Sequence, residues 1–373
     1  MDFLRLDDFG LTSLQISRGF MKKPTKLGIL TSGGDCPGLN AVIRAVVSHA
    51  TLTYDWQVFG IPYATQGLME RQVIPLHMHS FDLRGIDPLL SMGGTILGTI
   101  NKGNTLACID EMIASYQALE LDALIGIGGD GSIAILSQLA LHGNWQFIAI
   151  PKTIDNDVAL TERAIGFDTA VNTITNALNW LTFTAASHDR VMVVEVMGRE
   201  AGHLALHSGI AGGADVILIP EISYSIKEVC RHLAELRDRW QRRFAIIVVA
   251  EGIHPTHDAN SRSNQKLSCS KGQYIADCIA ECSAYPVDTR VSVLGHIQRG
   301  GIPSALDRLT AAAFGKTAVD LIAKGQSHQM VAWQNGQVVA VPIEQVRELS
   351  PLAVAPHSDL VQTARALGIY VGQ

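Results

Sequence analysis

Four times along the chain, a short apolar run ends in a glycine-rich turn and is followed by a helical pattern. The pattern is clearest where "KLGIL" (26–30) leads into "TSGGDCPG" and then into "LNAVIRAVVSHA". It returns in "LDALIGIGGDGSIAILSQLALHG", in "RVMVVEVMGREAGHLALHSG" and in "FAIIVVAEG". Continuous β-branched runs that alternate with helices are typical of parallel strands buried on both faces. The sequence therefore predicts α/β crossover units, with ligands bound beyond the carboxyl ends of the strands.

The predicted strands are too many for one small domain. The strand candidates are 26–31, 56–61, 122–127, 146–150, 190–197, 215–219, 244–250 and 288–293. A chain of 373 residues, 47% of them hydrophobic, is also long enough for two cores. We expect an α/β fold with two Rossmann-like lobes, parallel-rich sheets and an active-site cleft between them.

Two segments are predicted to lie outside these lobes. Residues 1–25 form an N-terminal extension, and the polar stretch 254–273 lacks apolar periodicity and is expected to be an exposed insertion. The first lobe should hold residues 26–166 plus about 298–348, and the second residues 167–297 plus about 349–373.

Charge and composition narrow the class of partner. A net charge of −6 with 17% charged residues favours neither a nucleic-acid nor a membrane-surface partner. The six cysteines are scattered, as expected of reduced thiols, and no window of about 18 apolar residues is found. We expect a cytoplasmic enzyme that acts on small anionic metabolites.

Two glycine turns carry residues suited to phosphate and metal. "TSGGDCPGLN" (31–40) places adjacent glycines before a helix, where free amides and the helix dipole attract anions. "GIGGDGS" (126–132) contains G-x-G-x-x-G, but the next strand ends without the acid that a dinucleotide site needs. Asp130 could instead meet a metal ion, and Gly131 would let a ligand approach. Simple turns are the alternative for both.

"PKTIDND" (151–157) places two carboxylates at the end of a predicted strand. Near a metal and a phosphate, one could act as a base for a hydroxyl and the other could support the metal. Thr153 could donate to a phosphoryl oxygen. The alternative is that Asp155 and Asp157 only form a turn or cap a helix.

Arginines at predicted strand ends suggest a phosphorylated substrate. Arg199 follows one apolar strand, and His296 and Arg299 follow another. With Arg190 and Arg290, four arginines are predicted at strand ends. A guanidinium matches the geometry of phosphoryl oxygens. A surface salt bridge is the alternative for any one of them.

These motifs, in this order, resemble those of the phosphofructokinase family of the ATP type, and more closely its mixed branch, in which some members use pyrophosphate. The resemblance runs from about Lys26 to Ala323. It rests on "GILTSGGDCPGLNAVIR", "GGDGS", "PKTIDND", "GFDTA", "EVMGREAG", "AEG" and "LGHIQRGG".

The resemblance implies a glycolytic 6-phosphofructokinase that uses Mg²⁺ and a nucleotide, ATP first, to phosphorylate the 1-hydroxyl of D-fructose 6-phosphate. Asp155 would be the base, Thr153 and Asp157 would complete the catalytic turn, and Arg199 would steady the transferred phosphoryl group. Asp130 would bind the metal. The donor contacts implied are Gly34, Asn101, Lys102, Asp130, Gly131, Ser132 and Lys152.

The second lobe would bind the sugar phosphate, and the first lobe the donor and Mg²⁺. The substrate contacts implied are Thr153, Asp155, Arg190, Met197, Gly198, Arg199, Glu251, Arg290, His296 and Arg299. In the family, arginines matching Arg190 and Arg290 are lent across a subunit boundary. This implies a homo-oligomer with shared active sites, a tetramer before a dimer.

Two residues that indicate the phosphoryl donor point to different donors. Gly131 matches the nucleotide type, in which the missing side chain leaves room for the α-phosphate, whereas Lys152 matches the pyrophosphate type. Asn101, Lys102 and Ile135 also depart from the simple bacterial pattern. We expect a nucleotide donor. The alternatives are ADP, a pyrophosphate-dependent enzyme, a sensing subunit without catalysis, and a kinase acting on NAD or lipid.

Overall fold

The computed structural model describes residues 25–82, 84–100, 105–255 and 270–372. Nearly all of the predicted extension 1–25 and most of the predicted insertion 254–273 lie outside these residues, as do Asn101 and Lys102. Within this part of the chain, no helix is long and apolar enough to cross a bilayer.

The strands form two separate sheets. The eight-stranded sheet has the order β12-β11-β5-β4-β1-β2-β3, with β6 beside β5. Its strands are β1 (Lys26–Thr31), β2 (Gln57–Gly60), β3 (Ile74–Leu76), β4 (Ala123–Gly128), β5 (Gln146–Thr153), β6 (Ile165–Gly166), β11 (Gln329–Gln334) and β12 (Gln337–Pro342). The four-stranded sheet has the order β10-β7-β9-β8 and consists of β7 (Arg190–Val196), β8 (Val216–Leu218), β9 (Ala245–Ala250) and β10 (Asp288–Val293).

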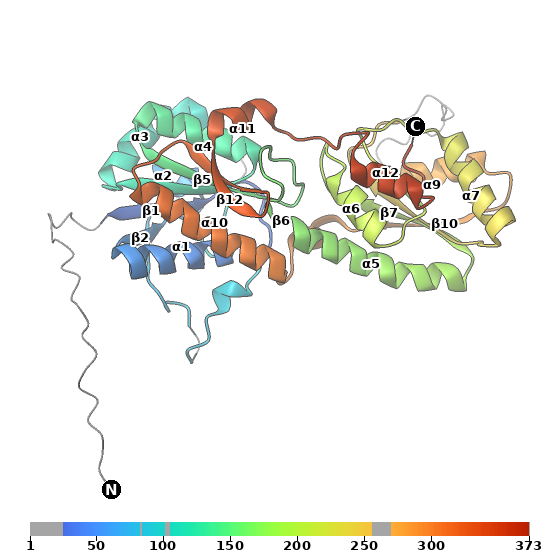
Figure 1. The fold of residues 1–373 in the computed structure, drawn as a ribbon, viewed down its shortest axis with the longest axis horizontal. Helices are drawn as coiled ribbons and strands as arrows, with labels where there is room; N and C mark the ends of the chain where they lie inside the picture. The colour runs from blue at the N-terminus through green and yellow to red at the C-terminus, as the bar shows by residue number, and fades with distance from the viewer. Residues whose placement is uncertain (1–24, 83, 101–104, 256–269, 373) are drawn as a thin grey trace, which may run out of the picture.

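Helices surround each sheet and make two lobes that lie end to end (Figure 1). The first lobe carries α1 (Leu39–Tyr54), α2 (Thr65–Met69), α3 (Ile109–Ala118), α4 (Asp130–Gly143), α10 (Ala305–Ala323) and α11 (Ile343–Leu349), with η1 (Pro88–Leu90) and η2 (Thr105–Cys108). The second carries α5 (Phe167–Ser187), α6 (His203–Ala211), α7 (Ile226–Trp240), α9 (Lys271–Cys282) and α12 (Asp359–Ala366), with η3 (Gly295–Arg299) where the chain turns back.

The parallel-rich α/β fold predicted from the sequence is confirmed. All eight predicted strands are present, and every pair among β1, β2, β4 and β5, and within the second sheet, is parallel. β4 and β9 are buried along their whole length, which explains why they are uniformly apolar.

Four strands were not predicted, and the predicted end of the polar insertion was wrong. β3, β6, β11 and β12 were missed, although Asn335–Gly336 between β11 and β12 is a strong hairpin signal. The predicted insertion extends too far, because α9 begins at Lys271. The Ser270 side chain accepts a hydrogen bond from the amide of Gln273 and caps this helix.

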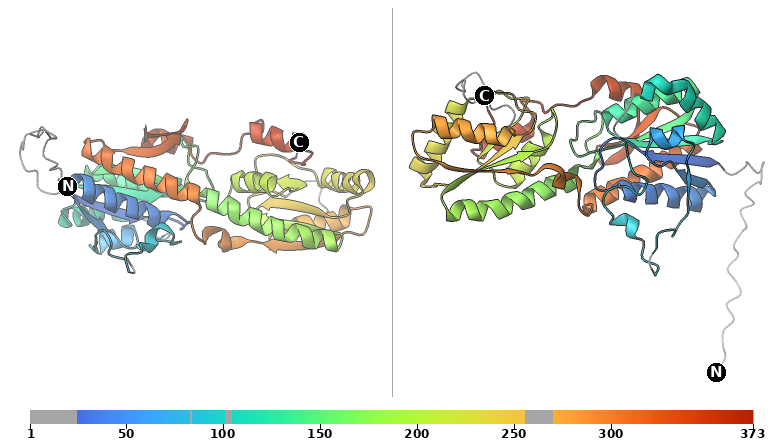
Figure 2. Two further views of the ribbon diagram at one scale, coloured as in Figure 1. Left: turned by 60° about the horizontal axis from the view of Figure 1, so that its bottom comes forward. Right: turned by 180° about the vertical axis from the view of Figure 1, so that it is seen from behind.

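Three segments of the chain connect the lobes, between β6 and α5, η3 and α10, and α11 and α12 (Figures 1 and 2). A buried carboxylate joins the first two. Asp307, in the first turn of α10, is 2% exposed and accepts from the amides of Gly166 (3.0 Å) and Thr169 (2.9 Å) and from the Thr169 hydroxyl. The amide of Ser304 in turn donates to that hydroxyl. The start of α5 is therefore fixed to the start of α10.

Replacing Asp307 with Asn should destabilise the protein. An amide offers one acceptor oxygen where the carboxylate offers two, so buried donors of Gly166 or Thr169 lose their partner. We expect the free energy of unfolding in urea to fall by about 2 kcal/mol. Asp110→Asn, at an exposed helix start, should change it by less than about 0.5 kcal/mol. Equal effects of the two substitutions would contradict this role of Asp307.

Candidate active site

The first glycine turn lies between β1 and α1 and is held by main-chain contacts. The amide of Ser32 donates to Ile127 O on the neighbouring β4 (2.9 Å), and the Thr99 hydroxyl donates to Gly33 O. Gly33 has φ +83°, and a Cβ there would lie 2.9 Å from Ser132 Oγ. Only glycine fits this position without strain. The turn therefore sits tightly against the start of α4.

Lys152 is a buried part of this arrangement. It lies at the end of β5, is 3% exposed, and donates from Nζ to Gly34 O. Burial lowers the pKa of the Lys152 ammonium. The Lys152 side chain therefore stabilises the main chain of the glycine turn and does not extend into open space.

Asp130, Gly131 and Ser132 form the first turn of α4, after the carboxyl end of β4. Ser132 faces the glycine turn. A Cβ at Gly131, in contrast, would meet no atom within 4 Å. The surface at Gly131 is therefore open, and an added side chain would occupy space that a ligand could fill.

Asp155 and Asp157 follow β5 and are buried, at 3% and 5% exposure. Within the described residues, Oδ1 of each lacks a hydrogen-bond partner. Burial raises the pKa of Asp155, and burial together with the nearby carboxylates of Asp155 and Asp130 raises the pKa of Asp157 to about 6. A buried carboxylate oxygen without a hydrogen-bond partner is costly, and two of them at the end of one strand mark a functional site.

Arg199 reaches the same place from the second lobe. Its Nε lies 3.7 Å from Asp155 Oδ2, and its amide donates to Glu251 Oε1 (2.9 Å). The backbone is tightly enclosed, because a Cβ at Gly252 would lie 1.9 Å from Arg199 O. Arg199 also has φ +52°, which is costly for a residue with a side chain and typical of functional sites.

A cavity of about 230 Å³ opens between the lobes at this point. It is lined by Asp130, Asp157, Arg199, Glu200, Ala201, Pro351, Leu352 and Ala353. The structure thus brings together side chains from the ends of β4, β5 and β7, as the sequence predicts for the carboxyl edge of parallel strands.

Residues that follow β10 contact the glycine turn. The Arg299 Nη1 donates to Asp35 O (3.3 Å) and lies beside Gly34, so an arginine of η3 contacts the glycine turn. His296 is exposed. The fully buried Gln298 was missed by the sequence analysis. It accepts from the amide of Met197 (3.1 Å) and donates to Gly295 O (2.9 Å).

Arg190 and Arg290, which the resemblance assigns to the site of a neighbouring subunit, do not line this cavity within one chain. Arg190 is the first residue of β7, and its Nε donates to Asp288 Oδ2 (2.9 Å), whereas Arg290 lies within β10 and also contacts Asp288. From Arg190 to Val196 is about 20 Å along the strand. The two arginines therefore lie far from Arg199 within one chain.

The carboxylates fit Mg²⁺ better than a metal bound by protein ligands alone. Among the described residues there is no group of three or more His, Cys, Asp or Glu side chains that could hold a metal. Mg²⁺ is usually bound by one or two carboxylates together with phosphate oxygens and water. Asp130 and the unpaired Oδ1 of Asp157 in one cavity match that donor set.

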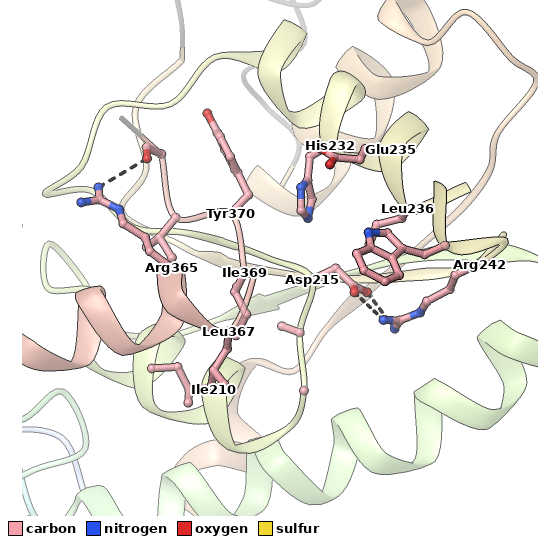
Figure 3. A pocket seen from close by; sticks show the side chains of 16 residues that line it. Ile210, Asp215, His232, Glu235, Leu236, Arg242, Arg365, Leu367, Ile369 and Tyr370 are labelled. Atoms are coloured by element: carbon pink, nitrogen blue, oxygen red, sulfur yellow. Dashed lines mark hydrogen bonds and ion pairs between the residues drawn. The ribbon is translucent and has the colours of Figure 1, made fainter. Parts of the chain in front are cut away.

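A larger cavity, of about 820 Å³, lies in the second lobe beside α7 and the C-terminal segment (Figure 3). There Asp215 and Arg242 already satisfy each other through two hydrogen bonds, of 2.7 and 3.0 Å. None of the predicted site residues lines it. We therefore place the candidate active site at the smaller cavity between the lobes, beside the two carboxylates whose Oδ1 atoms lack a partner among the described residues.

A family model and several known proteins match most of this chain. The family model described as Phosphofructokinase matches residues 26–322. The ATP-dependent 6-phosphofructokinase 2 of Nostoc sp. is 74% identical, over 93% of this chain and 99% of its own. The ATP-dependent 6-phosphofructokinase of Thermosynechococcus vestitus is 65% identical, over 93% of both chains.

Solved structures share the fold. Phosphofructokinase of Pichia pastoris superposes with a TM-score of 0.77 at 28% identity, covering 97% of this chain. This chain spans 38% of the Pichia chain and 47% of the Saccharomyces cerevisiae phosphofructokinase chain. A pyrophosphate-dependent phosphofructokinase of Nitrosospira multiformis has a TM-score of 0.78 at 21% identity, covering 94% of this chain and 93% of its own, which shows the fold alone.

Replacing Asp157 with Asn should stabilise the protein when no divalent cation is present. The folded-state pKa of Asp157, about 6, lies above its ordinary value of 3.8. Its contribution to stability is therefore complete below about pH 4 and is lost as the pH rises through about 6. The substituted amide would carry no charge, so the free energy of unfolding at pH 7.5 should rise by about 2 kcal/mol.

Asp288→Asn is the control with the opposite sign. The hydrogen bond from Arg190 lowers the pKa of Asp288, so this carboxylate stabilises the fold above about pH 4. Chemical unfolding in a chelating buffer at several pH values measures the stability of both variants and of the parent. An Asp157→Asn protein less stable than the parent at pH 7.5 would contradict the argument.

Proposed function

The chain belongs to the phosphofructokinase family, and we propose that it transfers the terminal phosphoryl group of ATP to the 1-hydroxyl of D-fructose 6-phosphate. The product would be fructose 1,6-bisphosphate, and the enzyme would act in glycolysis. The observation that carries the proposal is the buried Asp155, whose Oδ1 has no partner within the described residues and whose Oδ2 faces Arg199.

Asp155 is the base in this proposal. The substrate hydroxyl donates to Oδ1 and gives up its proton there as its oxygen forms a bond to the terminal phosphorus of ATP. The bond from that phosphorus to the bridging oxygen breaks, and ADP leaves. The raised pKa of Asp155, caused by burial, makes it a better proton acceptor than an exposed aspartate. Thr153 orients the turn, because its hydroxyl accepts from the Asp155 amide (3.0 Å). The Arg199 guanidinium neutralises charge on the phosphoryl group.

The first lobe would hold the donor and the second the sugar phosphate. Asp130, with Asp157 beside it, would hold Mg²⁺, which when bound neutralises charge on the donor phosphates. The glycine turn at Gly34 and the first turn of α4 at Ser132 would receive those phosphates. We also propose Asn101 and Lys102 as donor contacts, although they lie outside the described residues.

The environments of Gly131 and Lys152 favour a nucleotide donor. Open space at Gly131 supports room for the α-phosphate. Lys152 already bonds to Gly34 O, so its ammonium has a structural partner without a second phosphate group. The relatives named above as ATP-dependent agree with this choice. A pyrophosphate-dependent enzyme is the second candidate, because Lys152 is the residue type of that branch.

The sugar phosphate would be bound by Met197, Gly198, Glu251, His296 and Arg299. We propose that Arg190 and Arg290 of one subunit complete the site of another in a homotetramer in the cytoplasm. Their distance from Arg199 within one chain supports a site shared between subunits. Exposed apolar side chains support an oligomer too, since Trp180 and Phe183 on α5 are both 77% exposed.

Asp155→Ser should remove turnover while leaving sugar binding. Loss of the base should lower kcat by about 10²–10⁴-fold. The dissociation constant for fructose 6-phosphate, measured by calorimetry, should stay within about threefold, because the other proposed sugar contacts remain. Asp110→Ser, at an exposed position in the first turn of α3, is the control. Turnover comparable to that of the parent would refute the assignment of Asp155 as base.

The donor is tested by following fructose 1,6-bisphosphate formation with Mg²⁺ and ATP, ADP or pyrophosphate in parallel. We expect ATP to be the best donor for the parent. Gly131→Asp should lower the ATP rate by about tenfold or more, because the new carboxylate faces the donor phosphates. Gly131→Ala, which adds volume without charge, should keep more ATP activity. A parent that works best with pyrophosphate would replace the leading proposal by the second.

A further inference from the structure

Residues 350–354, "SPLAV", are a third element of the cleft, and we name them the strap. They leave α11 in the first lobe and lead towards α12 in the second (Figures 1 and 2). Pro351, Leu352 and Ala353 line the cavity that also contains Asp130, Asp157 and Arg199. The strap therefore forms one wall of the proposed phosphoryl-transfer site.

On one side, the strap is bonded to the main chain of the catalytic turn. The amide of Leu352 donates to Asp157 O at 2.6 Å. Two residues further along the turn, the amide of Ala159 donates to Ser350 Oγ at 2.9 Å. The position of the strap and the position of the Asp157 main chain are thus coupled.

On the other side, the strap is bonded to the start of α6. His203, the first residue of this helix, contacts Leu352 O through Nε2 at 3.0 Å. A carbonyl oxygen only accepts, so Nε2 must carry the proton. Burial lowers the pKa of His203, against a smaller opposite effect of the Leu352 carbonyl and the Glu221 carboxylate, so the ring is neutral at pH 7.

Glu221 makes a second link between the strap and the second lobe. Its Oε1 accepts from the amide of Val354 and from the amide of Gly202, both at 2.8 Å. Gly202 precedes His203, so Glu221 fixes the start of α6 and the end of the strap together. The main chain of Leu352 therefore bonds to both lobes, through its amide to Asp157 O and through its carbonyl oxygen to His203.

We propose, on the basis of the proposed function, that His203 is a positioning residue for phosphoryl transfer. Through Leu352 it holds the main chain of Asp157 and one wall of the cavity that Arg199 also lines. The proposed sugar contacts are supported elsewhere, since Gln298 holds Met197 and Arg299 contacts Asp35 O. Loss of the His203 bond should therefore slow the transfer step and leave fructose 6-phosphate binding unchanged.

His207 is a matched control, because it lies one turn later on α6. It is half-buried like His203, and burial lowers its pKa as well. Its Nδ1 donates to His203 O within the helix (2.8 Å), and its ring meets Phe167 edge-on at 5.0 Å. It thus packs within the second lobe, so removing its imidazole tests the effect of a lost ring on α6.

The test compares full-length His203→Leu, His203→Gln and His207→Leu proteins with the parent. In His203→Leu, kcat with Mg²⁺ and ATP should fall about tenfold, the effect expected for one lost hydrogen bond. The fructose 6-phosphate dissociation constant should stay within about twofold. His203→Gln keeps an N–H donor near the position of Nε2 and should restore most of kcat. His207→Leu should keep kcat within about twofold.

Hydrogen exchange of the Leu352 amide gives a second measurement that does not depend on turnover. It should become faster in His203→Leu, because Leu352 loses one of the hydrogen bonds that hold it, and stay unchanged in His207→Leu. Equal loss of kcat in both leucine variants, no recovery in His203→Gln, or unchanged exchange at Leu352 would each overturn the inference. A parent without fructose 6-phosphate kinase activity would instead refute the proposed function, and with it the catalytic role of His203, whatever the exchange showed.

Discussion

The site depends on the burial of two carboxylates at one edge of a parallel sheet. Asp155 and Asp157 lie in a low-dielectric environment, where an unpaired charge is costly, and their pKa values rise accordingly. The surrounding fold must hold them in place despite that cost. It does so through main-chain bonds to β4 and the strap, through Lys152 beneath the glycine turn, and through Arg199, which faces Asp155 from the second lobe.

The two lobes are joined in two ways around these carboxylates. Asp307 binds the starts of α5 and α10 with a buried carboxylate that accepts three hydrogen bonds. The strap instead joins the lobes through single hydrogen bonds at the cavity. One junction is thus deeply buried, while the other lies where ligands would bind.

Much of the architecture could be predicted because it is encoded locally. Each apolar run followed by a glycine turn gave a strand. The carboxyl ends of the parallel neighbours β4 and β5 lie at one sheet edge, and residues that follow β7, in the second sheet, line the same cavity. The ion pair of Arg190 and the hydrogen bond from Lys152 could not be predicted, since both depend on residues distant in sequence. Gln298 and His203 were missed for a related reason. Gln298 lies within the quoted motif "LGHIQRGG", but both side chains act on main-chain atoms, and the sequence alone does not show which main-chain atoms a neutral side chain will contact.

The order of the chain has a consequence for synthesis on the ribosome. The first lobe is interrupted by the second, because three of its elements follow β10 in sequence. β11 and β12 complete the first sheet, and α10 packs against α1. Until α10 has emerged, the apolar face of α1 remains uncovered, and until β11 has emerged, to about residue 334, so does the edge of β5. The nascent chain must therefore carry an unfinished, aggregation-prone half while an entire second lobe is translated, a period in which chaperones would shield it.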